Sequence, residues 1–212
     1  MGRYATDTGG GDFKQAPAGS HVARCIRLID LGTQTSEYQG QVNHKSQVLI
    51  SWELCHELYE YEDENKQKVQ KPFLVSAFYT NSLSEKANLR RDLISWRGRD
   101  FTKEELEKFD LQSILGAPCI VSVVINDKGK AKVEGVLKLT KGTEAPDCVN
   151  KPYAFWLDEF ERGKFDELSD GIKAIIEKSP EYQSMVKATT QELVNTLPPS
   201  HAFSDFDDSI PF

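Results

Sequence analysis

The sequence lacks long apolar runs. None of its hydrophobic stretches approaches the ~20 residues that a transmembrane helix needs, and residues 1–20 hold no apolar region of the kind found in secretory signals. We therefore expect a cytosolic protein with no membrane partner. Its 212 residues suit one domain of generous size, or one domain with appendages.

Cysteine and histidine are few and scattered. The chain has four of each, without a CxxC spacing, and Cys25, Cys55 and Cys119 lie inside apolar runs, as is typical of buried, reduced thiols. Catalytic signatures such as a phosphate-binding loop, an HExxH motif or a nucleophile elbow are missing as well. We therefore predict no catalytic residue, no metal site and no cofactor. The enzymatic alternative is a metal-dependent nuclease built on scattered carboxylates, which Mg²⁺-dependent loss of a labelled oligonucleotide would reveal.

The net charge of −7 is unevenly distributed. Residues 1–140 hold 19 basic and 19 acidic side chains, whereas residues 141–212 hold 7 and 14, so the whole excess lies in the C-terminal third. The first 140 residues, although neutral overall, can bind a polyanion locally if their basic side chains gather on one face. The acidic third keeps a second hypothesis open, in which the chain is a DNA mimic or adaptor that binds basic proteins instead of DNA. Retention on a poly-dT column at low salt would separate the two.

Apolar and β-branched residues in short runs predict five strands. These strands cover residues 21–32, 47–61, 71–80, 119–125 and 132–139. The period of two puts Val48, Ile50, Trp52 and Leu54 on one face of the second strand, so we expect Trp52 in the core. Residues 34–46 are polar and predict a loop, and the turn "NDKGK" joins the last two strands as a hairpin.

A change to helical spacing separates the third strand from the fourth. Residues 82–99 predict a helix that begins at a Ser84 cap and ends at Gly98, and Thr102 with Glu105 forms a capping-box pattern for a second helix over 102–110. Five strands with a helix between the third and fourth follow the order of an OB-fold, a partly open barrel that commonly binds single-stranded nucleic acids or oligosaccharides.

The predicted fold is therefore mainly β: a five-stranded OB-fold barrel with a helical insert between strands 3 and 4 and with C-terminal helices. One of these helices is expected at about 166–178, stopped by Pro180, and is followed by a second short one. The expected organisation is an extended N-terminal arm (1–19), an OB-fold core (20–140), an acidic, partly helical extension (141–195) and a flexible acidic tail (196–212).

The chain ends in "SDFDDSIPF", an acidic stretch with an apolar tip. A solubilising tail would explain the aspartates but not Phe206, Ile210 and Phe212. A docking motif explains both, because the aspartates meet a basic rim while Ile210 and Phe212 fill an apolar pocket. Pro211 restricts the chain and so reduces the entropy lost on docking.

The last eight residues closely resemble the C-terminal tip of bacterial single-stranded DNA-binding proteins. Ser209 departs from that tip, which usually has a further aspartate there. The matching residues are Asp205, Phe206, Asp207, Asp208, Ile210, Pro211 and Phe212. The tip recruits replication, recombination and repair proteins in that family, so the resemblance implies such partners for this chain.

Most of the remaining chain resembles a family of single-stranded DNA-binding proteins encoded by bacteriophages. The segments that carry this likeness are "DTGGGDF", "ISWEL", "LSEKANLRRDLISWRGRDFTKEELEKFDL" and "LGAPC". The resemblance implies an OB-fold core, no catalysis, and coating of exposed single strands during phage DNA replication in the cytoplasm of a bacterial host. Self-association stays open.

Residue chemistry gives the candidate DNA contacts, since single-strand binding needs cations for phosphates and flat side chains for bases. Trp96 is equally compatible with the core and with contact, and Phe78 and Tyr79 point to opposite faces, so that one of them faces outward. The candidates are Tyr38 and Lys45 after the first strand, Tyr79, the cluster Arg90, Arg91, Trp96, Arg97 and Arg99, and the hairpin lysines Lys128, Lys130, Lys132 and Lys138.

Overall fold

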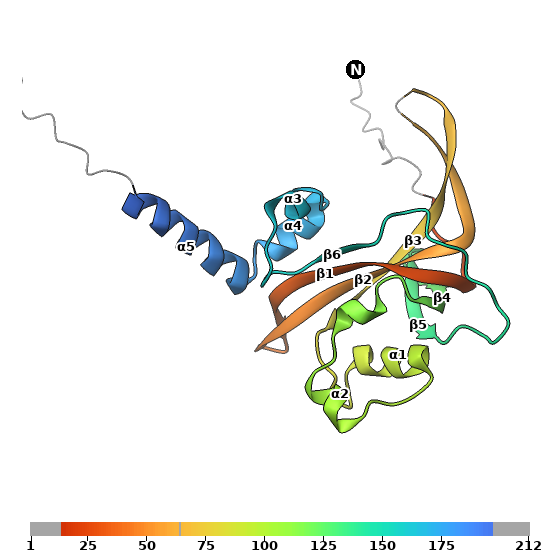
Figure 1. The fold of residues 1–212 in the computed structure, drawn as a ribbon, viewed down its shortest axis with the longest axis horizontal. Coiled ribbons are helices and arrows are strands. Elements are labelled where there is room, and N and C mark those ends of the chain that lie inside the picture. Colours follow the sequence, from red (N-terminus) through yellow and green to blue (C-terminus); the bar gives the residue numbers. More distant parts are fainter. Residues whose placement is uncertain (1–13, 64, 197–212) are drawn as a thin grey trace, which may run out of the picture.

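The computed structural model describes residues 14–63 and 65–196. Its centre is a six-stranded sheet in the order β3-β2-β1-β4-β5, with the short strand β6 beside β1 (Figure 1). The strands are β1 (Gly19–Tyr38), β2 (Gln41–Glu62), β3 (Lys68–Thr80), β4 (Pro118–Ile125), β5 (Ala131–Leu137) and β6 (Tyr153–Phe155). Neighbours on the main path are antiparallel, whereas β6 runs parallel to β1. The mainly β class is confirmed, but β3 and β5 are free edges, so the sheet does not close.

The first hairpin is longer than the sequence predicts. Residues 34–46 were expected to form a loop, and this is wrong: β1 and β2 stay paired as far as Tyr38 and Gln41. Gln39 and Gly40 form the turn, both with positive φ (51° and 75°), the geometry that matches the twist of a two-residue hairpin. Polar residues suit this ribbon because both of its faces are largely exposed to solvent.

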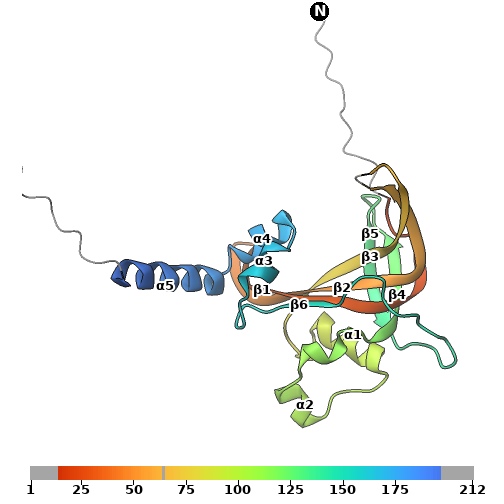
Figure 2. The ribbon, with the colours of Figure 1, turned by 45° about the horizontal axis from the view of Figure 1, so that its top comes forward.

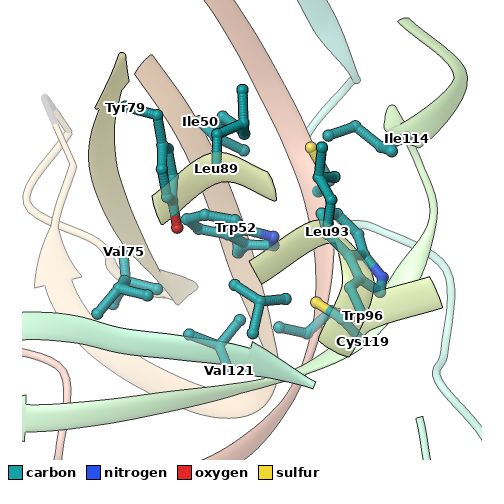
Figure 3. Packing of buried hydrophobic residues seen from close by; sticks show 14 of the residues in the cluster. Ile50, Trp52, Val75, Tyr79, Leu89, Leu93, Trp96, Ile114, Cys119 and Val121 are labelled. Atoms are coloured by element: carbon teal, nitrogen blue, oxygen red, sulfur yellow. Dashed lines mark hydrogen bonds between the residues drawn. The ribbon is translucent and has the colours of Figure 1, made fainter. Parts of the chain in front are cut away.

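The inner face of the sheet carries the main core. Val48, Ile50, Trp52 and Leu54 all lie in it, which confirms the predicted face of β2. Figure 3 shows Trp52 between Tyr79 and Trp96, with ring centroids 6.4 Å and 6.2 Å away. The helix α1 (Asn88–Arg97) covers this face and contributes Leu89, Leu93 and Trp96 to the core.

The helical insert follows the predicted order with a later start. Gly98 ends α1 in the left-handed region (φ 70°), as expected, but the helix begins after Ala87 and Ser84 does not cap it. Ser84 instead accepts a hydrogen bond from the Ala87 N–H in a turn before the helix. The capping box of Thr102 and Glu105 is confirmed at α2 (Lys103–Glu107), and the 3-10 turn η1 (Leu111–Ile114) leads into β4.

The C-terminal extension places α3 and α4 on the opposite, outer face of the sheet, while α5 projects away from it (Figures 1 and 2). It consists of β6, α3 (Arg162–Asp166), α4 (Asp170–Ile176) and α5 (Pro180–Thr196). A second apolar cluster joins it to the sheet: Ile29, Leu31, Leu49, Phe155, Phe165, Leu168 and Ile176. Consequently β2 is buried on both faces from Val48 to Leu54.

Pro180 begins a helix instead of following one. Proline fits the first turn of a helix because the backbone N–H that it lacks would have no helical partner there. The helix expected at about 166–178 is divided into α3 and α4, and the expected short helix is α5, with 17 residues. Within residues 14–63 and 65–196, no helix combines the length and apolarity needed to cross a membrane.

Buried polar anchors fix the segment that leads from β5 to β6. The Glu53 side chain lies under this segment and is 1% exposed, and its carboxylate accepts hydrogen bonds from Val149 N (2.6 Å), Asn150 N (2.9 Å) and Asn150 Nδ2 (2.6 Å). Arg24 donates to the carbonyl oxygens of Ala145 and Pro146, both at 2.7 Å. These bonds position the polypeptide that enters the outer face.

Candidate nucleic-acid interface

An open groove crosses the strands on the outer face of the sheet, with a volume of about 830 Å³. Two cross-strand rows of residues contribute to its floor. The first row is Ser76, Ser51, Arg27 and Tyr153, and the second is Phe78, Leu49 and Ile29. We call this site the outer groove. It runs across β3, β2, β1 and β6 in turn.

The C-terminal extension supplies the walls of the outer groove. Residues 150–152 line it before β6, and Lys164, Glu167, Leu168, Ser169 and Ile172 line it from the α3–α4 region. Tyr153 joins wall to floor, since its hydroxyl donates to the Lys164 carbonyl oxygen. Burial raises the pKa of Tyr153, so this phenol remains a hydrogen-bond donor at neutral pH.

The outer groove combines an exposed ring with cations. Phe78 is 56% exposed, and neither Arg27 nor Lys151, both exposed, has a carboxylate partner in the described part of the chain. Lys164 is paired with Glu161 at 2.7 Å. Hydroxyl groups lie between ring and cations, with Ser76 donating to Ser51 at 2.8 Å. Such a surface can stack a base and neutralise phosphates.

Two aromatic candidates from the sequence are buried in the core. Tyr79 is 6% exposed and donates a hydrogen bond to Asp92 (2.9 Å). Its pKa is raised mainly by burial and further by the nearby Asp92 carboxylate. Trp96 is 7% exposed and donates its indole N–H to the Pro118 carbonyl oxygen (2.8 Å). Neither buried ring offers a face for stacking: the core alternative holds for Trp96, and Tyr79 lies on the core side of β3. Phe78 is the outward ring of the Phe78–Tyr79 pair.

The arginine cluster makes ion pairs within the chain. Arg90 pairs with Asp100 (3.3 Å), Arg91 with Asp92 (3.0 Å), and both Arg97 and Arg99 pair with Glu105, the latter at 2.7 Å. Hydrogen bonds from Arg99 and from Thr102 N, with Arg97 adding to them, lower the pKa of Glu105 to about 2. These carboxylates offset much of the positive charge that, from the sequence, we expected to contact DNA phosphates.

Arg97 also packs against aromatic rings. Its guanidinium lies 4.3 Å from the Phe101 ring centroid and 5.1 Å from that of Phe109. Its side chain is only 15% exposed. Arg97 therefore holds α1 against the segment around α2, which is a structural role whatever else it contacts.

The remaining sequence candidates lie away from the outer groove. Lys128, Lys130 and Lys132 are exposed on the β4–β5 hairpin, and Lys138 follows β5. Tyr38 is the last residue of β1, and Lys45 is exposed on β2 opposite Gln34. The tail candidates lie outside the described residues.

The sequence analysis missed Arg27, Lys151 and Lys164. Each is a single cation among apolar or acidic residues, and such a residue gives no cluster signal in the sequence. Across residues 14–63 and 65–196, no group of three or more His, Cys, Asp or Glu side chains is arranged to hold a metal ion. The chain matches no protein-family model and no curated protein.

Proposed function

We propose that this protein binds single-stranded DNA without sequence preference, through an OB-fold core. The observation that carries the proposal is the outer groove, whose lining combines exposed Phe78 with Arg27 and Lys151, two cations that pair with no carboxylate of the described residues. The strand order β3-β2-β1-β4-β5, with α1 between β3 and β4, supports the OB-fold, in which the two free edges would approach each other.

The outer groove suits a single strand better than a duplex. Phe78 needs an unstacked base to stack on, and bases are unstacked only where a strand is free of its complement. The groove runs across the strands, from β3 to β6, so a flexible strand can follow it. A rigid duplex would meet the wall formed by residues 150–152 and the α3–α4 region.

We expect poly-dT to bind more tightly than a duplex at every salt concentration. Contacts from Arg27 and Lys151, with or without Lys164, give two or three phosphate pairs. The outer groove alone should therefore contribute about −1.4 to −2 to the slope of log K against log salt. Titration followed by intrinsic tryptophan fluorescence at several salt concentrations measures both quantities.

Three outcomes would redirect the proposal. Duplex binding as tight as single-strand binding at every salt would contradict it. Failure to stay on a poly-dT column at low salt would favour the alternative of an acidic adaptor that binds basic proteins. Mg²⁺-dependent shortening of the oligonucleotide would favour a nuclease.

The C-terminal tip extends the proposal to partner proteins. Its sequence supports recruitment of replication, recombination or repair proteins to coated DNA in a bacterial host cell, because acidic and apolar residues together suit a basic-rimmed pocket. The coated strands would be those exposed during phage replication or recombination.

We expect Phe212→Ala to abolish binding to purified bacterial proteins that recognise the tip of bacterial single-stranded DNA-binding proteins. Phe212 supplies an aromatic ring to the apolar tip, so the substitution removes the group that would fill the pocket. Pull-down on immobilised full-length chain measures this, with Ser209→Ala as the matched control. Undiminished binding by the Phe212 variant would falsify the docking role while leaving DNA binding untouched.

A further inference from the structure

A second groove lies between α1, α2 and the end of β5, with a volume of about 540 Å³. Three cations line it, Arg97, Arg99 and Lys138, against one carboxylate, Glu105. Apolar residues, among them Phe109 and Pro118, complete its lining. The second groove therefore keeps an excess of positive charge after its internal ion pairs are counted.

Donors in the second groove remain available after those ion pairs form. Arg99 gives two nitrogens to Glu105 but keeps 57% of its side chain exposed. Among the described residues, the buried Arg97 Nη1 has no hydrogen-bond partner, and Lys138 has no carboxylate partner. An unsatisfied buried donor is unfavourable, so an anion in the second groove is favoured near Arg97.

The backbone holds Lys138 in the second groove. Lys138 N donates to the Ser95 carbonyl oxygen of α1 at 3.0 Å. The Lys138 side chain passes over Gly98, where an added Cβ would come within 2.7 Å of Lys138 Cδ. Gly98 thus serves twice: it adopts the left-handed conformation that ends α1, and it leaves room for the lysine.

Both grooves border the same short segment. Gln112 and Leu115 line the outer groove, whereas Ser113, Ile114 and Ala117 line the second groove. Only the turn η1 and the residues after it separate them. A chain leaving the outer groove at the β6 end therefore meets the second groove after crossing a single turn.

We infer that the second groove binds a backbone phosphate of the same single strand, with Lys138 and Arg99 as the direct contacts and Arg97 as their support. This inference rests on the proposed function and adds a second contact region to it. Phosphate is the ligand class that the donors favour, because they are cations in an open site that offers no acceptor besides Glu105 among its charged groups.

Oligonucleotides of two lengths test the two grooves separately. The outer groove spans three inter-strand spacings, or about 14 Å, which corresponds to about four nucleotides of a strand that rises ~3.4 Å per nucleotide along its axis, as in a duplex. An oligo-dT of about four nucleotides should fill the outer groove alone, whereas one of about 16, the upper range for an OB-fold, should reach both.

Lys138→Ala should weaken binding of the long oligo-dT and leave the short one unchanged. We expect a loss of about fivefold to tenfold at roughly 50 mM salt, and a salt slope shallower by about 0.7, the value for one phosphate on a single strand. The full-length protein is titrated with each length by tryptophan fluorescence. Lys103→Ala is the matched control, since this exposed lysine begins α2 outside the second groove.

The outcomes distinguish this inference from the proposed function. Unchanged binding of the long oligo-dT by the Lys138 variant would overturn the inference and leave the proposed function intact. An equal loss on both lengths, or an equal loss with Lys103→Ala, would also overturn it, because general electrostatics would then explain the effect. Failure of the wild-type chain to bind either length would overturn the proposed function, and this inference with it.

Discussion

Phe78→Ala should lower the affinity for poly-dT by roughly tenfold to a hundredfold, because stacking of a base on an aromatic ring contributes ~1–3 kcal/mol. The ring is 56% exposed in the outer groove, so its removal leaves no cavity in the core. Fluorescence titration at low salt measures the loss. The salt slope should stay unchanged, since the substitution removes no cation.

Leu74→Ala is the matched control for this experiment. Leu74 lies on β3 two alternations from Phe78, on the same face, and is also exposed, but it does not line the outer groove. Both variants should unfold at the same urea concentration as the wild type. An equal loss of affinity in the two variants, or none with Phe78→Ala, would remove the outer groove from the binding surface.

Alternation along single strands predicted most of the sheet but not its extensions. The period of two located the cores of β3, β4 and β5, where more and less buried residues alternate, whereas β1 and β2 were located by their apolar runs, since both are buried on two faces there. It failed at residues 34–46, where the hairpin extends beyond the core and polar residues occupy both faces. It also missed β6, whose three residues are too few to form a pattern and which pairs with β1 only through long-range packing.

The choice between Phe78 and Tyr79 needed tertiary information. Alternation separates the two residues but does not say which face of β3 meets the core, particularly when the neighbouring β2 is buried on both faces. Asp92 of α1 shows that Tyr79 is the inward residue, because its carboxylate accepts the hydrogen bond of the buried Tyr79 hydroxyl. That partner lies 13 residues away in the sequence.

The arginine cluster did contain a signal that sequence analysis could have used. Each arginine lies within ten residues of its acidic partner: Arg91 is next to Asp92, Arg90 pairs with Asp100, and Arg97 and Arg99 pair with Glu105 at the capping-box position. Mixed charges at such short spacing favour local ion pairs over an open cationic surface. Arg27 and Lys151 make no ion pair with any carboxylate in residues 14–63 and 65–196, which leaves them available in the outer groove.

Glu53→Ala should destabilise the protein by about 3–5 kcal/mol, because the buried carboxylate makes three hydrogen bonds of ~1.5–3 kcal/mol each and the cost of its desolvation offsets part of their sum. The substitution leaves Val149 N and Asn150 N without their acceptor beneath the segment that enters the outer face. Urea unfolding of the variant measures the loss of stability. Hydrogen exchange at these two amides should accelerate more than at amides of β1.

Glu60→Ala is the matched control, since Glu60 is exposed on the same strand and its carboxylate makes one long hydrogen bond, to Gln70 at 3.4 Å. It should change stability by less than about 0.5 kcal/mol, as is usual for surface substitutions. Glu53→Gln should fall between the two, because the amide keeps one accepting oxygen but presents its own N–H groups to the backbone donors. Equal stability of the Glu53 and Glu60 variants would mean that residues 146–151 stay in place without the carboxylate. The outer groove would then owe its wall to the apolar cluster around Phe155 alone.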